Sequence, residues 1–242
     1  MKVSFFMAAE HFDYSKISYN KNDDWDDVSL IDLENLLQMK GQVKEFRILM
    51  MKYDSALLEV RTKLDVLNKE LALRNNRNPF EAIKMRIKTP LSIYKKLISK
   101  GVDFSIENID KYISDVAGIR VVCSFVDDIY MLADCLANQD DIRVIQRKDY
   151  IDKPKKSGYR SLHLIIEVPI FLVQEKEYMK VEVQFRTIAM DFWASLEHKM
   201  KYKKDNINQE VISDDLKFSA DLINQLDLRM QQIRRKIDGE EE

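Results

Sequence analysis

Glycine, cysteine and histidine are scarce in this chain of 242 residues, and each scarcity excludes a class of function. No two of the five glycines are close enough for a Walker A loop or a GxGxxG turn, so any phosphate would be bound by lysine and arginine side chains. Two cysteines cannot form a disulfide framework, and the three histidines lack the spacing of metal ligands. No window approaches about 18 apolar residues, and the N-terminal apolar run is too short for a signal peptide. We therefore expect a cytoplasmic protein without a membrane partner.

The overall composition is that of a globular protein that is rich in charge. Hydrophobic residues make up 45% of the chain and charged residues 33%, which is enough apolar content to build a sizeable core. The 39 basic and 41 acidic residues nearly cancel, so the chain has no overall positive field to hold nucleic acid or anionic lipid. Any site for an anion must be a local cluster.

Two such clusters of basic residues are present. The segment from Lys84 to Lys100 contains six basic and no acidic residues. The segment from Asp141 to Arg160 contains seven basic and three acidic residues. A single run of this kind is more often a solvated surface. Two runs, one just before and one within a predicted sheet, favour a binding site for a polyphosphate.

Periodicity predicts a mixed sheet with helices packed on it, an α/β fold of the α+β type. Helical patterns cover 30–40, 42–73, 90–100, 127–138 and 187–204, and a final helix follows the polar segment 205–209. Strand patterns cover 118–125, 142–148, 161–168 and 179–186. We divide the chain into a helical N-terminal arm (1–78), a catalytic body (79–204) and a helical C-terminal arm (205–242).

Alternation along the strands brings polar side chains together. Glu182, Gln184 and Arg186 share one face of the last strand because successive side chains point to opposite faces. Asp115 lies just before the first strand, where an isolated carboxylate is usually a turn or helix cap. Paired with Glu182, it forms a set of two acids that could hold Mg²⁺ beside phosphates.

Three longer motifs resemble the synthetase domain of the Rel/Spo family. They are Asp115-Val116-Ala117-Gly118-Ile119-Arg120, the loop Lys155-Lys156-Ser157-Gly158-Tyr159-Arg160 with His163, and Glu182-Val183-Gln184-Phe185-Arg186-Thr187 with the downstream Trp193 and Glu197. Upstream, Arg86-Ile87-Lys88 and the spacing from Ser92 to Lys96 match the ATP-binding segment of that family. The resemblance spans about Phe80 to Tyr202. Within it, the segments Asp127-Asp128-Ile129-Tyr130 and Arg147-Lys148-Asp149-Tyr150-Ile151 look closest to the stand-alone branch called RelP.

The resemblance implies a fold, a reaction and roles for individual residues. The fold would be a nucleotidyltransferase-like mixed sheet, and the reaction would transfer the β,γ-pyrophosphate of ATP to the 3′-hydroxyl of GDP or GTP, for synthesis only, in the stringent response. Glu182 would be the catalytic base and Asp115 would bind Mg²⁺, with Glu182 near the same ion. The remaining roles are ATP binding by Arg86, Lys88, Ser92 and Lys96, acceptor binding by Tyr159, Lys155, His163 and Gln184, and lining of the site by Arg120.

Two other functions remain open on the residues alone. A module that binds RNA or nucleotides could use the same basic runs without catalysis, although a binding module gives no reason for two acids in the site. An interaction protein could rely on its helical arms. The resemblance also implies a homotetramer, which agrees with the long apolar stripe of the helix at 42–73, and it gives no reason to expect DNA as a partner.

Overall fold

The computed structural model describes residues 41–75, 77–202 and 209–239, which form five strands and six helices. The helices are α2 (Val43–Asn75), α3 (Pro90–Ser99), α4 (Ile106–Tyr112), α5 (Val126–Ala137), α6 (Ile188–Tyr202) and α7 (Gln209–Asp238). The strands are β1 (Phe80–Ile87), β2 (Ala117–Cys123), β3 (Arg143–Asp149), β4 (Leu162–Phe171) and β5 (Lys176–Thr187).

The strands form one mixed sheet in the order β1-β2-β5-β4-β3. Strands β2 and β5 run parallel in its centre, and the other three pairs are antiparallel. In β5, Val181, Val183 and Phe185 alternate with polar residues, whereas β2 is almost entirely apolar and carries a single polar residue, Arg120. Each of the two parallel strands also pairs with an antiparallel neighbour, β2 with β1 and β5 with β4.

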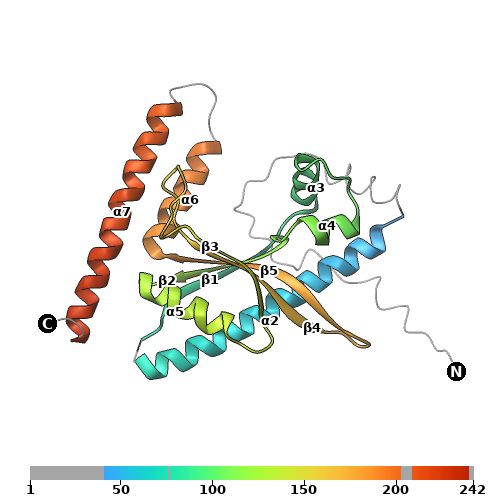
Figure 1. The fold of residues 1–242 in the computed structure, drawn as a ribbon, viewed down its shortest axis with the longest axis horizontal. Helices are drawn as coiled ribbons and strands as arrows, with labels where there is room; N and C mark the ends of the chain where they lie inside the picture. The colour runs from blue at the N-terminus through green and yellow to red at the C-terminus, as the bar shows by residue number, and fades with distance from the viewer. Residues whose placement is uncertain (1–40, 76, 203–208, 240–242) are drawn as a thin grey trace.

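The apolar face of the sheet is covered by α2 and α5, which lie on its lower side in Figure 1. The side chains of Tyr53, Val60 and Leu64 on α2 are fully buried in the same core as Val121 and Val183 on the sheet. Burial of this apolar surface is the main force that stabilises the fold. The helix predicted from the periodicity of residues 42–73 is thus part of the main core.

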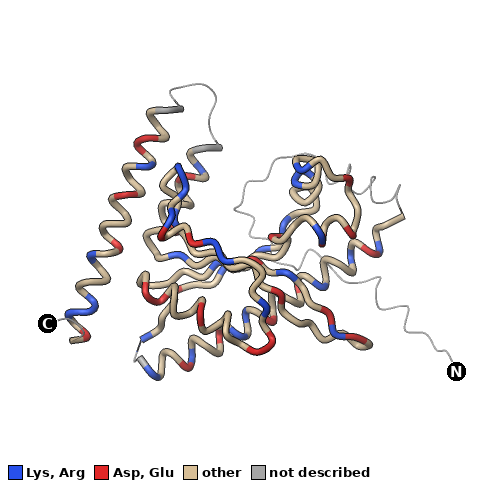
Figure 2. The backbone as a smooth tube through the Cα atoms, in the orientation of Figure 1, with Lys and Arg blue, Asp and Glu red and all other residues tan. Residues whose placement is uncertain are grey.

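The polar face of the sheet points toward the side that holds the remaining four helices (Figure 1). Helix α3 is capped by the Thr89 side chain and lies with α4 at one end, whereas α6 and α7 pack on each other at the other end. Figure 2 shows lysines and arginines at both ends, on α3 and on the loop between β3 and β4. No helix in the described ranges has an apolar stretch that would span a lipid bilayer.

The predicted fold class is confirmed, and two elements are additional. All four predicted strands are present, as are the predicted helices within the described residues. Strand β1 and helix α4 were not predicted. The segment of β1, FEAIKMRI, mixes apolar and charged residues and exposes half of them, as an edge strand can. The helix predicted over 30–40 lies outside the described residues.

Candidate active site

The strand register places the predicted site residues in two adjacent rows across the polar face. One row contains Arg86, Gly118, Glu182 and Ile165. The next row contains Lys84, Arg120, Gln184, His163 and Lys148. Residues from motifs that lie far apart in the sequence thus become neighbours because the strands pair in this order.

Glu182 is held by donors on both of its carboxylate oxygens. Gln184 Nε2 donates to Oε2 at 2.7 Å, and His163 Nδ1 lies 3.3 Å from Oε1. Burial favours the neutral acid, but the hydrogen bonds from His163 and Gln184 and the positive charge of Arg86 outweigh it and lower the pKa of Glu182 to about 2. At neutral pH the side chain is a carboxylate in a fixed orientation.

These contacts continue into a closed ring of hydrogen bonds. Arg186 Nη2 donates to the Tyr159 hydroxyl at 2.8 Å and to Gln184 Oε1 at 3.2 Å, and the Tyr159 hydroxyl lies 2.9 Å from His163 Nε2. Because Arg186 can only donate, the Tyr159 proton is free to go to His163 Nε2, which assigns the other imidazole proton to Nδ1, facing Glu182. The ring sets the rotamer of each of its five members.

Asp191, at the start of α6, balances the cations behind this ring. Its carboxylate lies 3.1 Å from Arg186 Nη1, 3.3 Å from Arg120 Nη1 and 3.2 Å from Lys84 Nζ. Burial opposes ionisation, but these three cations lower the pKa of Asp191. The sequence interpretation did not select Asp191, because only the packing of α6 on the sheet brings it to the polar face.

A second group of charges lies around Asp115, just before β2. Lys96 Nζ on α3 is 2.7 Å from Asp115 Oδ2, and Lys88 Nζ is 3.4 Å from the same oxygen. Burial lowers the pKa of Lys88, with Arg86 and Lys96 adding to the effect against the pull of Asp115. Since the charge of Arg86 lowers the pKa of both Lys88 and Glu182, Arg86 lies within electrostatic reach of both groups.

Arg86 and Ser92 complete this side of the site. A Cβ on Gly118 would lie 3.4 Å from Cγ and Nε of Arg86, so the Arg86 side chain runs across the backbone of β2 at the one position without a side chain. The Ser92 hydroxyl is 2.9 Å from the Thr89 hydroxyl in the first turn of α3. Arg86 is solvent-exposed and free to meet a ligand.

The opposite side of the site is an aromatic wall carried by β4 and the loop before it. We call residues 150–161 the β3–β4 loop. The Lys155 ammonium lies 4.6 Å from the ring centre of Tyr150 and 4.7 Å from that of Tyr159, and Tyr150 packs edge-on against His163 at 5.2 Å. Lys155 is exposed, so this wall combines a flat aromatic surface with an accessible positive charge.

The carboxylates fit a magnesium ion in one respect that the structure shows directly. Asp115 Oδ1 is buried and has no hydrogen-bond partner, whereas Oδ2 is held by Lys96, so one oxygen remains for a ligand. Mg²⁺ commonly binds one or two carboxylates and takes its other ligands from water and substrate phosphates. In keeping with this, the described residues contain no group of three or more side chains of the types that hold a metal by themselves.

Known proteins resemble this chain over most of its length. The family model "Region found in RelA / SpoT proteins" matches residues 85–207. The GTP pyrophosphokinase YwaC of Bacillus subtilis is 41% identical over 212 residues, covering 88% of this chain and 100% of that protein. The GTP pyrophosphokinase YjbM of the same organism is 32% identical over 195 residues, covering 80% of this chain and 90% of that protein.

Solved structures agree with this assignment. The small alarmone synthetase 2 of Bacillus subtilis superposes with a TM-score of 0.72 at 42% identity, over 80% of this chain and 100% of that one. The small alarmone synthetase 1 of Bacillus subtilis bound to its product pppGpp superposes with a TM-score of 0.72 at 32% identity, over 81% of this chain and 99% of that one. The higher identity to synthetase 2 agrees with the branch predicted from the sequence. The chain belongs to the RelA/SpoT family, as its motifs predicted.

Proposed function

We propose that this chain is a GTP pyrophosphokinase that transfers the β,γ-pyrophosphate of ATP to the 3′-hydroxyl of GDP or GTP, producing ppGpp or pppGpp and AMP. Both similar proteins from Bacillus subtilis carry the name GTP pyrophosphokinase. Related structures contain pppGpp or AMPCPP, a product and an ATP analogue. The observation that supports the reaction most directly is the Glu182 carboxylate, which is fixed on both oxygens on a face rich in lysine and arginine.

The two charged groups divide the substrates between them. Arg86, Lys88 and Lys96 bind the ATP phosphates, because they supply three cations next to Asp115, which has one oxygen without a hydrogen-bond partner. Ser92 lines the same pocket. Tyr159 stacks on guanine, and Lys155, next to it, binds the acceptor's phosphates. His163 and Gln184 face the acceptor ribose on either side of Glu182, and Arg120 lines the site between the two groups.

The transfer step needs positioning more than strong general-base catalysis. The acceptor 3′-oxygen attacks the β-phosphorus of ATP, the bond from that phosphorus to the oxygen of the α-phosphate breaks, and AMP leaves with the electron pair. Glu182 accepts the hydroxyl proton and releases it to solvent. A carboxylate with a pKa near 2 is a weak base but is always ionised at neutral pH, so it orients the hydroxyl in line for a loose transition state.

Fixed cations supply the remaining stabilisation. The charge that develops on the transferred group and on AMP lies toward Arg86, Lys88 and Lys96. Lys88 and Lys96 need little reorganisation because Asp115 already holds them in place. Mg²⁺ bound at Asp115, with Glu182 close by, would supply further neutralisation of the triphosphate. We infer a cytoplasmic reaction, where both nucleotides are available.

Product formation by the wild type and by Glu182→Gln tests this function. The wild type, incubated with γ-labelled ATP, GDP or GTP and Mg²⁺, is expected to yield a labelled tetra- or pentaphosphate together with AMP. Glu182→Gln is expected to abolish transfer while ATP still binds, and Glu167→Gln, a control further along the neighbouring strand, is expected to remain active. A folded wild type that gives no product would instead favour the module that binds nucleotides or RNA without catalysis.

We also infer that the chain assembles as a homotetramer through its helices. One stripe of α7 is apolar and exposed, and its members repeat at intervals of four or seven residues: Val211, Phe218, Leu222, Leu226, Ile233 and Ile237. The stripe lies beside the face of α7 that packs on α6, so a second copy could cover it without displacing α6. Light scattering is expected to give four times the chain mass of 28.6 kDa, and a monomer would refute the inference.

A further inference from the structure

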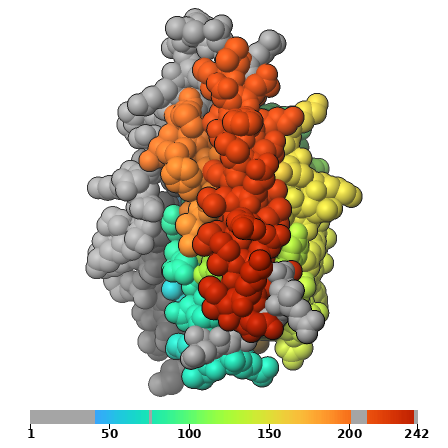
Figure 3. All heavy atoms as spheres, turned by 90° about the vertical axis from the view of Figure 1, so that its left-hand side faces the viewer, coloured from blue at the N-terminus to red at the C-terminus, as the bar shows by residue number. Residues whose placement is uncertain are grey.

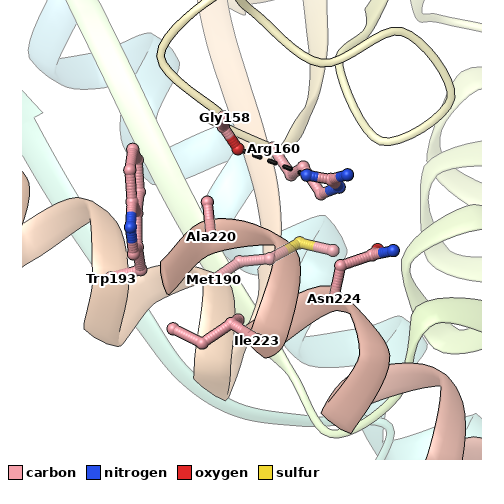
Figure 4. A pocket seen from close by; sticks show the side chains of 7 residues that line it. All are labelled: Gly158, Arg160, Met190, Trp193, Ala220, Ile223 and Asn224. Atoms are coloured by element: carbon pink, nitrogen blue, oxygen red, sulfur yellow. Dashed lines mark hydrogen bonds between the residues drawn. The ribbon is translucent and has the colours of Figure 1, made fainter. Parts of the chain in front are cut away.

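The β3–β4 loop rests directly on the C-terminal helix. Gly158 has a φ of +86°, and a Cβ on it would lie 2.6 Å from Ala220 Cβ and 3.4 Å from Lys217 Cα of α7. Arg160 Nη2 lies 3.3 Å from Asp221 Oδ1, and Arg160 Nη1 donates to the Gly158 carbonyl at 3.4 Å. In Figure 4 the Ala220 side chain points at Gly158. The backbone of the loop thus contacts helix α7 directly, although the two segments lie about 60 residues apart in the chain.

Tyr159 itself packs on the same helices. It contacts a small hydrophobic cluster of Trp193, Ala194, Leu216 and Ala220 that is separate from the main core under the sheet. Trp193 Nε1 on α6 donates to the Leu216 carbonyl of α7 at 3.0 Å, which fixes the two helices to each other. Figure 3 shows α7 lying between α6 on one side and the segment that contains the β3–β4 loop on the other.

The contact between loop and helix is a packed interface with no room for a ligand. The space lined by Gly158, Arg160, Met190, Trp193, Ala220, Ile223 and Asn224 has a volume of about 10 Å³, which is no more than one water molecule needs. A larger side chain at position 220 therefore has no free volume to enter and must displace either the loop or the helix.

We propose that α7 is a positioning element of the acceptor site: the Ala220–Gly158 contact sets the height of the β3–β4 loop, and with it the place of Tyr159 and Lys155. This inference rests on the proposed function, since it assigns the acceptor nucleotide to Tyr159. The C-terminal helix thereby acts on acceptor binding without touching a substrate, and the ATP side, built on β1, α3 and the segment before β2, is independent of it.

Ala220→Leu tests the proposal from the helix side. The added carbons are expected to push Gly158 away, raise the KM for GDP about tenfold and leave the KM for ATP within about twofold, because only the aromatic stack is displaced. Ala220→Ser adds a single oxygen, which can donate a hydrogen bond to the carbonyl one turn earlier, and it is expected to keep the kinetics of the wild type. An unchanged KM for GDP in Ala220→Leu, or an equal rise in the KM for ATP, would overturn the proposal.

Gln231→Ala separates positioning from general loosening of α7. Gln231 is buried at the far end of the helix, where its side chain bonds the backbone N–H and the carboxylate of Asp127 at the start of α5. Its removal is expected to lower the melting temperature without changing the KM for GDP. If Gln231→Ala raised that KM as much as Ala220→Leu, stability of the helix rather than the loop contact would be the cause.

Hydrogen exchange gives a measurement that does not depend on activity. The β3–β4 loop is closed by Gly158 N–H to the Lys155 carbonyl at 2.8 Å and by Lys155 N–H to the Tyr159 carbonyl at 3.2 Å. Ala220→Leu is expected to speed exchange in a peptide covering 150–161 about tenfold, with Ala220→Ser and Gln231→Ala unchanged there. A wild type without activity but with this exchange pattern would refute the proposed function alone, and identical exchange in all four proteins would refute the loop contact.

Discussion

Tyr159 has two separable parts, and their separate removal is the sharpest test of the active site. Its ring lies 4.7 Å from the Lys155 ammonium and 5.1 Å from the Arg186 guanidinium and offers a face for stacking. Its hydroxyl joins Arg186 to His163, at 2.8 and 2.9 Å, in the ring of hydrogen bonds that ends on Glu182. Tyr159→Phe removes only the hydroxyl, whereas Tyr159→Ala removes both.

The expected size of each effect follows from these contacts. Tyr159→Phe loses two hydrogen bonds, one of them from a charged donor that keeps its bonds to Gln184 and Asp191. Their net contribution is about 1–2 kcal/mol, so kcat is expected to fall about 5- to 30-fold as His163 loses its orientation toward Glu182. Tyr159→Ala loses the stack as well, worth about 1–3 kcal/mol, and is expected to raise the acceptor KM about 5- to 150-fold.

Initial rates, with GDP varied at saturating ATP and then ATP varied at saturating GDP, distinguish the two parts. For Tyr159→Phe we expect the acceptor KM within about twofold of the wild type, because the stacking face is intact. Tyr178→Phe is a matched control, since Tyr178 lies on the same sheet beyond the site, under the guanidinium of Arg143 at 4.0 Å. The reasoning fails if Tyr159→Phe raises the acceptor KM as much as Tyr159→Ala, or if either variant mainly raises the KM for ATP.

Three further predictions concern ATP binding and stability. Arg86→Ala is expected to raise the KM for ATP about tenfold, with Arg61→Ala on α2 as an inert control, and an unchanged KM would remove Arg86 from the ATP site. Asp191→Asn is expected to lower the melting temperature at pH 7, because the Asp191 carboxylate has a lowered pKa and stabilises the fold once the pH is above its ordinary value. The difference from the wild type should shrink as the pH falls below 3.8, and a difference that does not change with pH would contradict this reason. Asp227→Asn is expected to do the opposite, because burial raises the pKa of Asp227 and its charged form therefore destabilises the fold at pH 7. The neutral amide can still accept a hydrogen bond from the Thr187 hydroxyl, so calorimetry should show a higher melting temperature at pH 7, with a gain that declines toward pH 3.8.

Local patterns in the sequence predict much of the fold because they reflect short-range geometry. The alternation in Val181–Arg186 gives one polar face whatever the strand pairs with, and the helix at 42–73 follows from apolar spacing of three or four residues. Strand β1 escaped this approach, since half of its residues are exposed charged or long side chains beside solvent. Helix α4, of seven residues, is too short for periodicity to reveal.

The candidate site divides in the same way. Ordered motifs select Asp115, Tyr159 and Glu182, because residue type and spacing along one chain are enough to match a family. Asp191 was not selected, and Arg186 was placed on the polar face without a role, since their contacts depend on α6 folding back over the sheet and on pairing across strands. No spacing rule predicts that Arg186, Tyr159, His163, Glu182 and Gln184 close into a ring.

The sequence by itself determined the family and the polar face of the sheet, and it predicted the residue types that would meet phosphate, because each depends on composition or on periods of a few residues. The tertiary structure decided the lateral order of the strands, the fixed orientation of Glu182 and the contact of Gly158 with Ala220. These depend on which segments pack together across long stretches of chain, and packing is set by the shape of the whole core. A helix that looks like an appendage in the sequence therefore lies under the loop that carries Tyr159.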